Sequence, residues 1–108
     1  MKVRDYLSIP YLLEAQAVER DGQWTRRLRY PELGNIEAVH DDVERALLDL
    51  ERARITEVMR RLRAGDPPPV PRRPLETTDQ GWWARRLGLG ALVDGQLDRD
   101  AQDLTNDG

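Results

Sequence analysis

The chain has 108 residues, which is enough for one small domain and a short tail, and its formal net charge is −3. It contains no cysteine and a single histidine, so disulfides, thiolate metal sites and histidine clusters are excluded, and we expect no metal and no cofactor. No run of about 18 apolar residues could span a membrane, and the first residues lack the apolar core of a signal peptide. We therefore expect a cytoplasmic protein.

Residues 11–30 predict a β-hairpin, whereas residues 1–10 are too short a stretch to assign. The sequence YLLEAQAVE (residues 11–19) alternates only in part, and its Leu, Ala, Glu and Gln also favour a helix. Asp21-Gly22 decides for the hairpin, because a type I′ turn needs positive φ at both central positions. In the second strand Trp24, Leu28 and Tyr30 form an apolar face opposite a basic one.

A third strand and one long helix follow the hairpin. Pro31 ends the second strand, and 36–39 reads as a short third strand. The helix is expected from His40 to Leu62, with Asp41 as its N-cap and Glu44 in its first turn. The fold class is thus α/β of the α+β type, with a small antiparallel sheet of three or four strands covered by one helix.

The expected helix carries two apolar lines about 120° apart on the helical wheel. The first line is suited to pack on the sheet and consists of Val43, Ala46, Leu47, Leu50 and Ala53. The second line is our candidate for self-association or partner packing and consists of Leu48, Ile55, Met59 and Leu62. A single core around a curved helix is the alternative, since apolar helix positions commonly belong to the core.

The domain is expected to span residues 1–75, followed by an acidic tail of residues 76–108 that docks on a partner or is partly disordered. Its proline-rich end suggests polyproline, an edge strand near Val70 or a rigid spacer. The tail carries 3 Lys and Arg against 7 Asp and Glu, which suits a basic partner or simply keeps the tail soluble.

A short amphipathic helix in the tail, weakened by two glycines, would carry apolar anchors, and the last dozen residues would fray. Two adjacent tryptophans either complete a small core or dock on another protein, and we choose docking. The candidate partner-binding residues are Trp82, Trp83, Leu87 and Leu92, with Leu89 as an alternative to Leu92.

Two chemical interpretations compete with this one. His40, Asp41, Asp42 and Glu44 could hold a metal and a base, but Asp41 and Glu44 already serve the helix start, so we predict that the chain is not an enzyme. Arg27 and Arg29 could protect an exposed edge strand, and the basic side chains of the second strand and the tail could together bind phosphate or lie neutralised among nearby acids. These side chains are Arg26, Arg27, Arg29, Arg85 and Arg86.

The order of these elements resembles the HicB-like antitoxins over residues 8–75. The matching pieces are Asp21-Gly22-Gln23-Trp24, Pro31-Glu32-Leu33-Gly34, the helix start from His40 to Ala46, and Gly65-Asp66-Pro67 through Pro71. The resemblance implies a truncated RNase H-like fold and a chain that oligomerises and covers the active site of a small basic ribonuclease toxin.

Many members of that family also carry a C-terminal DNA-binding module. The region after residue 75 is too short and too acidic for such a module, so we do not expect nucleic-acid binding by this chain alone. The partners expected are a small basic, toxin-like protein and further copies of the chain. An adaptor subunit of a larger assembly and a transcriptional regulator are the alternative functions.

Overall fold

The computed structural model describes residues 1–107 and divides the chain into two compact units. The sheet unit comprises Tyr11–Arg54, and the helical unit comprises Met1–Pro10 together with Ile55–Gly108. Helix α2 (Val43–Ala64) contributes its first half to the sheet unit and its second half to the helical unit. The division does not fall at residue 75, because the acidic segment shares a unit with the first ten residues.

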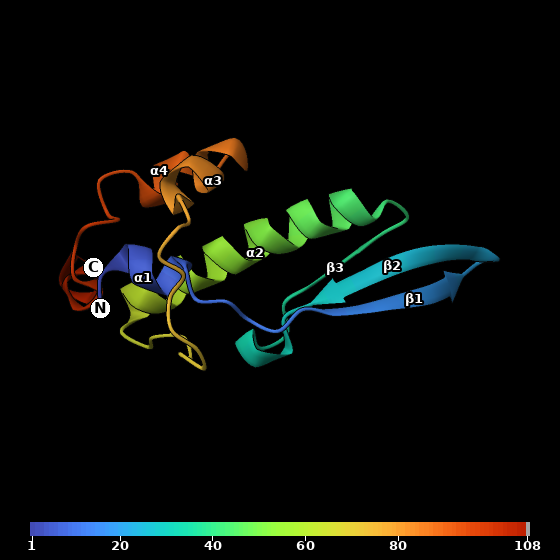
Figure 1. The fold of residues 1–108 in the computed structure, drawn as a ribbon, viewed down its shortest axis with the longest axis horizontal. Coiled ribbons are helices and arrows are strands. Elements are labelled where there is room, and N and C mark those ends of the chain that lie inside the picture. Colours follow the sequence, from blue (N-terminus) through green and yellow to red (C-terminus); the bar gives the residue numbers. More distant parts are fainter. Residues whose placement is uncertain (108) are drawn as a thin grey trace. The chain divides into compact units, whose positions relative to one another are not determined.

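The sheet is antiparallel, with strands β1 (Glu14–Arg20), β2 (Gln23–Arg29) and β3 (Glu37–His40) in the order β1-β2-β3 (Figure 1). Asp21 and Gly22 have φ of 53° and 80°, so the predicted hairpin turn has the positive angles of type I′. β1 begins later than predicted. The Leu12 amide instead donates to the Glu32 carboxylate at 2.8 Å, next to the 3₁₀ turn Pro31–Leu33.

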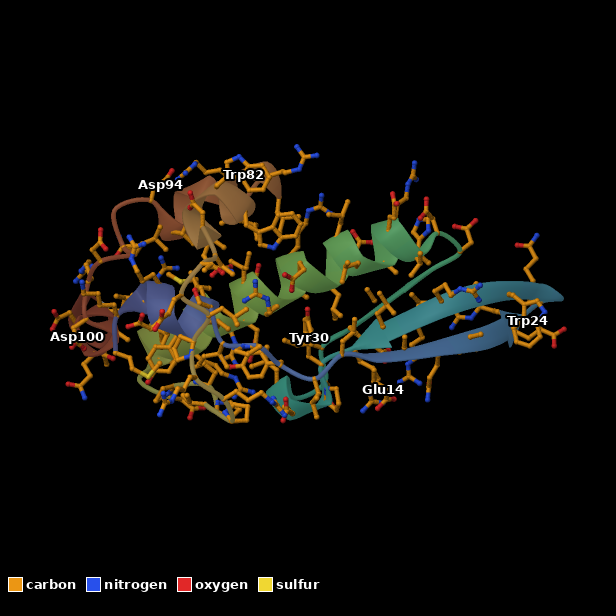
Figure 2. The ribbon with its side chains drawn as sticks, viewed as in Figure 1. Glu14, Trp24, Tyr30, Trp82, Asp94 and Asp100 are labelled. Carbon is orange, nitrogen blue, oxygen red and sulfur yellow. The ribbon has the colours of Figure 1, made fainter. Side chains whose placement is uncertain are left out.

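The first half of α2 packs on this sheet, which confirms the predicted α+β architecture with three strands. The buried apolar side chains of the sheet unit are Tyr11, Leu28, Tyr30, Leu33, Ala38, Ala46 and Leu50. Trp24 does not join them, because its side chain is 62% exposed near the hairpin turn (Figure 2). The apolar face predicted for β2 is therefore covered only where Leu28 and Tyr30 lie.

A buried polar cluster joins Tyr30, the residue that follows β2, to α2. The Tyr30 hydroxyl donates to Glu51 Oε2 at 2.8 Å, and Arg54 Nε donates to the same oxygen at 2.6 Å. The side chain of Arg54 is only 6% exposed, and that of Glu51 14%. Burial, and then the negative charge of Glu51, raise the pKa of Tyr30 well above its usual range. Tyr30 is therefore a neutral donor, and Arg54 balances the charge of Glu51.

Helix α2 starts three residues later than predicted, and its cap is Asp42 rather than Asp41. Asp42 Oδ1 accepts from the Glu44 amide at 2.9 Å, and the Asp42 carbonyl accepts from the Ala46 amide at 3.0 Å. The helix ends at Gly65, whose φ of 74° is the left-handed conformation common just past a helix end.

The helical unit is closed by two segments from opposite ends of the chain. Helix α1 (Val3–Leu7) has only five residues, too few to be stable alone. Its first amides donate to the tail, from Val3 to the Arg99 carbonyl and from Arg4 to the Leu97 carbonyl, both at 3.0 Å. The Ala101 amide, at the start of the 3₁₀ helix Ala101–Asp107, donates to the Met1 carbonyl at 2.9 Å. The two ends therefore lie side by side (Figure 1).

Two helices fill the segment where the sequence predicted one. Helix α3 (Gln80–Arg86) and helix α4 (Gly90–Val93) are separated at Gly88, whose φ is 80°. Between Gly65 and α3 the described chain forms neither helix nor strand, so no edge strand lies near Val70, which is 46% exposed. This segment is tied to the start of the unit, because the Leu75 amide donates to the Ser8 carbonyl at 2.9 Å.

The core of the helical unit contains side chains from all of its parts. The buried apolar residues are Val3, Leu7, Ile9, Ile55, Val58, Met59, Leu62, Ala84, Leu87, Val93, Ala101 and Leu104. Leu104 is 1% exposed, so the described part of the last dozen residues is anchored here rather than frayed as predicted. Gly108 lies outside the described residues.

On the second half of α2, two guanidinium groups hold one carboxylate. Arg60 Nε and Arg61 Nε each lie 2.9 Å from a carboxylate oxygen of Glu57. The hydrogen bond from Arg60 is the main cause that lowers the pKa of Glu57, from 4.5 to about 2, and partial burial opposes it.

The buried charge of Glu51 predicts the effect of removing its partner. Arg54→Met should lower the free energy of unfolding by about 3 kcal/mol, because it leaves a buried carboxylate without its balancing cation. The control is Arg52→Met on the same helix, which removes an exposed pair with Asp49 and should cost less than about 0.5 kcal/mol. Urea titration of both variants measures the difference, and equal losses would contradict the role of Arg54.

The lowered pKa of Glu57 predicts a pH-dependent stability. Because its pKa is lower in the folded chain, the stabilisation is fully present above pH 4.5 and is lost as pH falls toward 2. Glu57→Gln should lower the free energy of unfolding by about 1 kcal/mol at pH 7, since Arg60 is exposed to screening solvent. Urea titrations from pH 7 down to pH 2.5 should show the gap to wild type closing, and a constant gap would contradict this assignment.

Candidate functional site

Among the described residues of the helical unit, Trp82 is the most exposed of the large apolar residues, at 55% exposure. Asp79 caps α3 by accepting from the Trp82 amide at 3.0 Å, so the residue stands on an ordered first turn. Its ring is stacked on Trp83, with centroids 6.3 Å apart and planes 20° apart. The Arg86 guanidinium lies 5.8 Å from the Trp82 ring centroid. Trp82 is thus held by neighbours while its outer surface faces solvent (Figure 2).

The structure separates the four partner-binding residues predicted from sequence. Trp82 is exposed, and Trp83 and Leu92 are half-buried. Leu87 is 4% exposed and packs in the core with Ala84 and Val93, so it offers no surface to a partner. Among the four residues predicted for docking, Trp82 is therefore the exposed one, and Trp83 and Leu92 are accessible only in part.

The second apolar line of α2 is largely used within the chain itself. Ile55 and Met59 are fully buried and Leu62 is 2% exposed, all within the core of the helical unit. Only Leu48 keeps part of its surface, in a shallow depression lined also by His40, Arg45, Asp49 and Arg52. Three of the four residues that we assigned to self-association or partner packing therefore pack in the chain's own core, as the alternative interpretation had it.

Three of the acidic residues of the tail make contacts within the helical unit. Asp79 caps α3, Asp94 pairs with Arg85 at 3.3 Å, and Asp98 pairs with Arg4 at 2.7 Å. The carboxylates of Asp94 and Asp98 are 57% and 76% exposed, and each is neutralised by its paired arginine. These ion pairs therefore contribute to holding the helical unit together.

The basic face of β2 is neutralised across the strands. Arg27 pairs with Glu37 of β3 at 2.6 Å, and Arg29 lies 3.7 Å from Glu14 of β1. β2 is the central strand, so these arginines do not protect a sheet edge, which corrects that interpretation. The geometry favours a solvated face over a phosphate-binding one.

The residues considered for catalysis lie at the start of α2. His40 Nδ1 accepts from the Asp42 amide at 3.0 Å, and Asp42 caps the helix. Within residues 1–107 no group of three or more histidine or carboxylate side chains is arranged to hold a metal ion. In the same part of the chain no helix is both long enough and apolar enough to cross a membrane.

The comparisons with known proteins found no match to a family model, a curated protein or a solved structure. The resemblance to HicB-like antitoxins thus depends on the residues quoted above and stays a hypothesis.

Sequence reasoning missed the contribution of the first ten residues to this region. Val3 and Leu7 are fully buried, and α1 receives its first-turn partners from the tail. A five-residue helix is too short to show a helical period of apolar residues in the sequence. The acidic Asp5, three positions after Lys2, was the one local indication of a helix start. The Asp5 carboxylate does accept from the Lys2 amide at 2.9 Å.

The contrast between Leu87 and Trp82 predicts two different mutational effects. Leu87→Ala should lower the free energy of unfolding by about 3 kcal/mol, because it leaves a cavity in the core. Trp82→Ala should cost about 1 kcal/mol or less, because the side chain is already half exposed. Thermal and urea unfolding measure both effects, and a larger loss for Trp82→Ala would contradict its assignment to the surface.

Proposed function

We propose that this chain is a non-enzymatic, protein-binding antitoxin that neutralises a small basic ribonuclease in the cytoplasm. The observation that carries the proposal is the exposed Trp82, held on a capped helix by Trp83 and Arg86. Tryptophan is enriched among the residues that dominate binding energy at protein interfaces. A large, ordered, exposed ring thus supports a role in docking on another protein.

The architecture of the sheet unit also supports the proposal. A hairpin, a third strand and a long covering helix follow one another in the order that the HicB-like resemblance implies. The charge of residues 76–108 supports the chemistry of the partner, because 7 Asp and Glu against 3 Lys and Arg give this segment, which carries Trp82, a negative field. A basic partner would be attracted to this field, and the attraction would weaken with added salt.

The test begins with the partner. The full chain, tagged and expressed in its native cells, is captured at low salt, and the co-purified proteins are identified by mass. Recovery of one small basic protein that cleaves RNA alone, and stops cleaving with an equimolar amount of this chain, would support the proposal. Recovery of large or several subunits without ribonuclease activity would contradict it and favour an adaptor role.

Substitution of the exposed tryptophan then tests the surface. Trp82→Ala should weaken binding of the captured partner about 30-fold, which corresponds to about 2 kcal/mol. The matched control is Trp24→Ala, since Trp24 is equally large and is 62% exposed in the sheet unit. Calorimetry on both variants measures the effect, and equal affinities for Trp82→Ala and wild type would remove Trp82 from the interface. Point substitutions suit this test better than deletion of the tail, because α1 depends on the tail carbonyls.

A further inference from the structure

The long free edge of the sheet belongs to β1. This strand pairs only with β2, and no other strand among residues 1–107 pairs with it. Its seven residues match β2 one to one from Glu14↔Arg29 to Arg20↔Gln23, so no bulge interrupts the strand. Proline and lysine, which commonly protect such edges, are absent from it. β3, the other edge, has only four residues.

The middle of β1 is small, uncharged and accessible. Ala15, Gln16 and Ala17 are exposed, and Val18 is half-buried. Small side chains let a second strand approach closely, and the backbone groups of an edge strand are available to pair with it. The charged residues of the strand lie at its two ends, with Glu14 at the first end and Glu19 and Arg20 at the other.

Two copies of β1 have complementary charges when they run antiparallel, because one end of the strand carries Glu14 and the other Arg20. In an antiparallel pair of two β1 strands related by a two-fold axis at Ala17, all seven residues of each strand are paired. Glu14 of each copy then lies directly opposite Arg20 of the other, and directly opposed residues share one face of a sheet. A shift of two residues in either direction removes both ion pairs. One register is therefore favoured over its neighbours.

The existing contacts of Glu14 are compatible with this arrangement. Its carboxylate lies 3.7 Å from Arg29 on the β2 side and is still 41% exposed. It can therefore meet a second guanidinium from the free side of β1. Each of the two opposite-charge pairs would favour association, with Glu14 lying between Arg29 of its own chain and Arg20 of the other copy.

From this geometry we infer that two copies of the chain associate through β1 in this register. The product is a continuous six-stranded antiparallel sheet in the order β3-β2-β1-β1-β2-β3. The inference depends on the sheet unit alone and is independent of the proposed function, whose contact is Trp82 in the helical unit. It replaces the self-association surface predicted on α2, where Ile55, Met59 and Leu62 are buried.

The first experiment measures the mass of the full chain in solution by sedimentation from low to high micromolar concentration. We expect a dimer of about 25 kDa, twice the 12.5 kDa of one chain. Ala17→Lys places two ammonium groups at the two-fold axis and should give a monomer that is still folded, because Ala17 is exposed. A wild-type monomer at all concentrations, or a dimer insensitive to Ala17→Lys, would overturn the inference.

The second experiment tests the register by complementation. Arg20→Glu and Glu14→Arg, each as a single variant, oppose like charges at both ends and should weaken the dimer at least about tenfold. An equal mixture of the two variants should dimerise again, because every opposed pair then regains opposite charges. Arg26→Glu on β2 is the matched control and should dimerise as wild type does. Failure of the mixture to dimerise would overturn this register, even if both single variants are monomers.

A strand of another protein is the other possible occupant of this edge. If the chain is a monomer alone, and the amides of β1 gain protection from hydrogen exchange only with the captured partner, the inference of self-pairing is wrong. The edge then belongs to the interface with that partner. Loss of ribonuclease binding in Trp82→Ala, by contrast, leaves the dimer unaffected, so the two proposals fail separately.

Discussion

The sheet unit depends on one carboxylate, that of Glu51, which connects β2 to α2. Its oxygen Oε2 accepts from the Tyr30 hydroxyl and from Arg54 Nε, all in a largely buried setting. The apolar contacts around it are few, since the buried apolar residues of β2, β3 and the first half of α2 are only Leu28, Ala38, Ala46 and Leu50. In so small a core a shared buried charge fixes the helix at one position along the strands more strictly than apolar contact alone.

The same small core explains why so much of the sheet stays exposed. α2 covers the sheet where Leu28 and Ala38 lie, and the outer part of the hairpin has little cover on either face. The charges of the opposite face are balanced by cross-strand pairs, which makes that face suited to water. What remains for recognition is the backbone edge of β1 in one unit and the Trp82 ring in the other. The two units therefore present different kinds of surface, one of main-chain groups and one aromatic.

Local signals made the sheet unit predictable. Asp21-Gly22 specifies its turn through backbone angles alone, and the helical period identified α2 to within three residues at each end. The helical unit was not predictable in this way, because its contacts join Val3 to Arg99 and Arg4 to Leu97, far apart in sequence. A helical wheel also shows that Ile55, Met59 and Leu62 share a side, but not whether the chain itself or a neighbour covers it. Leu87 and Trp82 were grouped for the same reason, although one is core and the other surface.

The two units differ in how their residues are distributed along the chain, and this difference bears on synthesis. The sheet unit is one continuous segment, Tyr11–Arg54, so all residues that make its internal contacts are synthesised before the rest of the chain. The core of the helical unit contains both Val3 and Leu104, so the first ten residues cannot be fully buried until the last segment has been synthesised. On the ribosome the hairpin and the first half of α2 can therefore form early. The N-terminal residues and the apolar side of Ile55 and Met59 stay uncovered until the tail emerges, which makes this interval the time when the nascent chain is most open to chaperones and proteases.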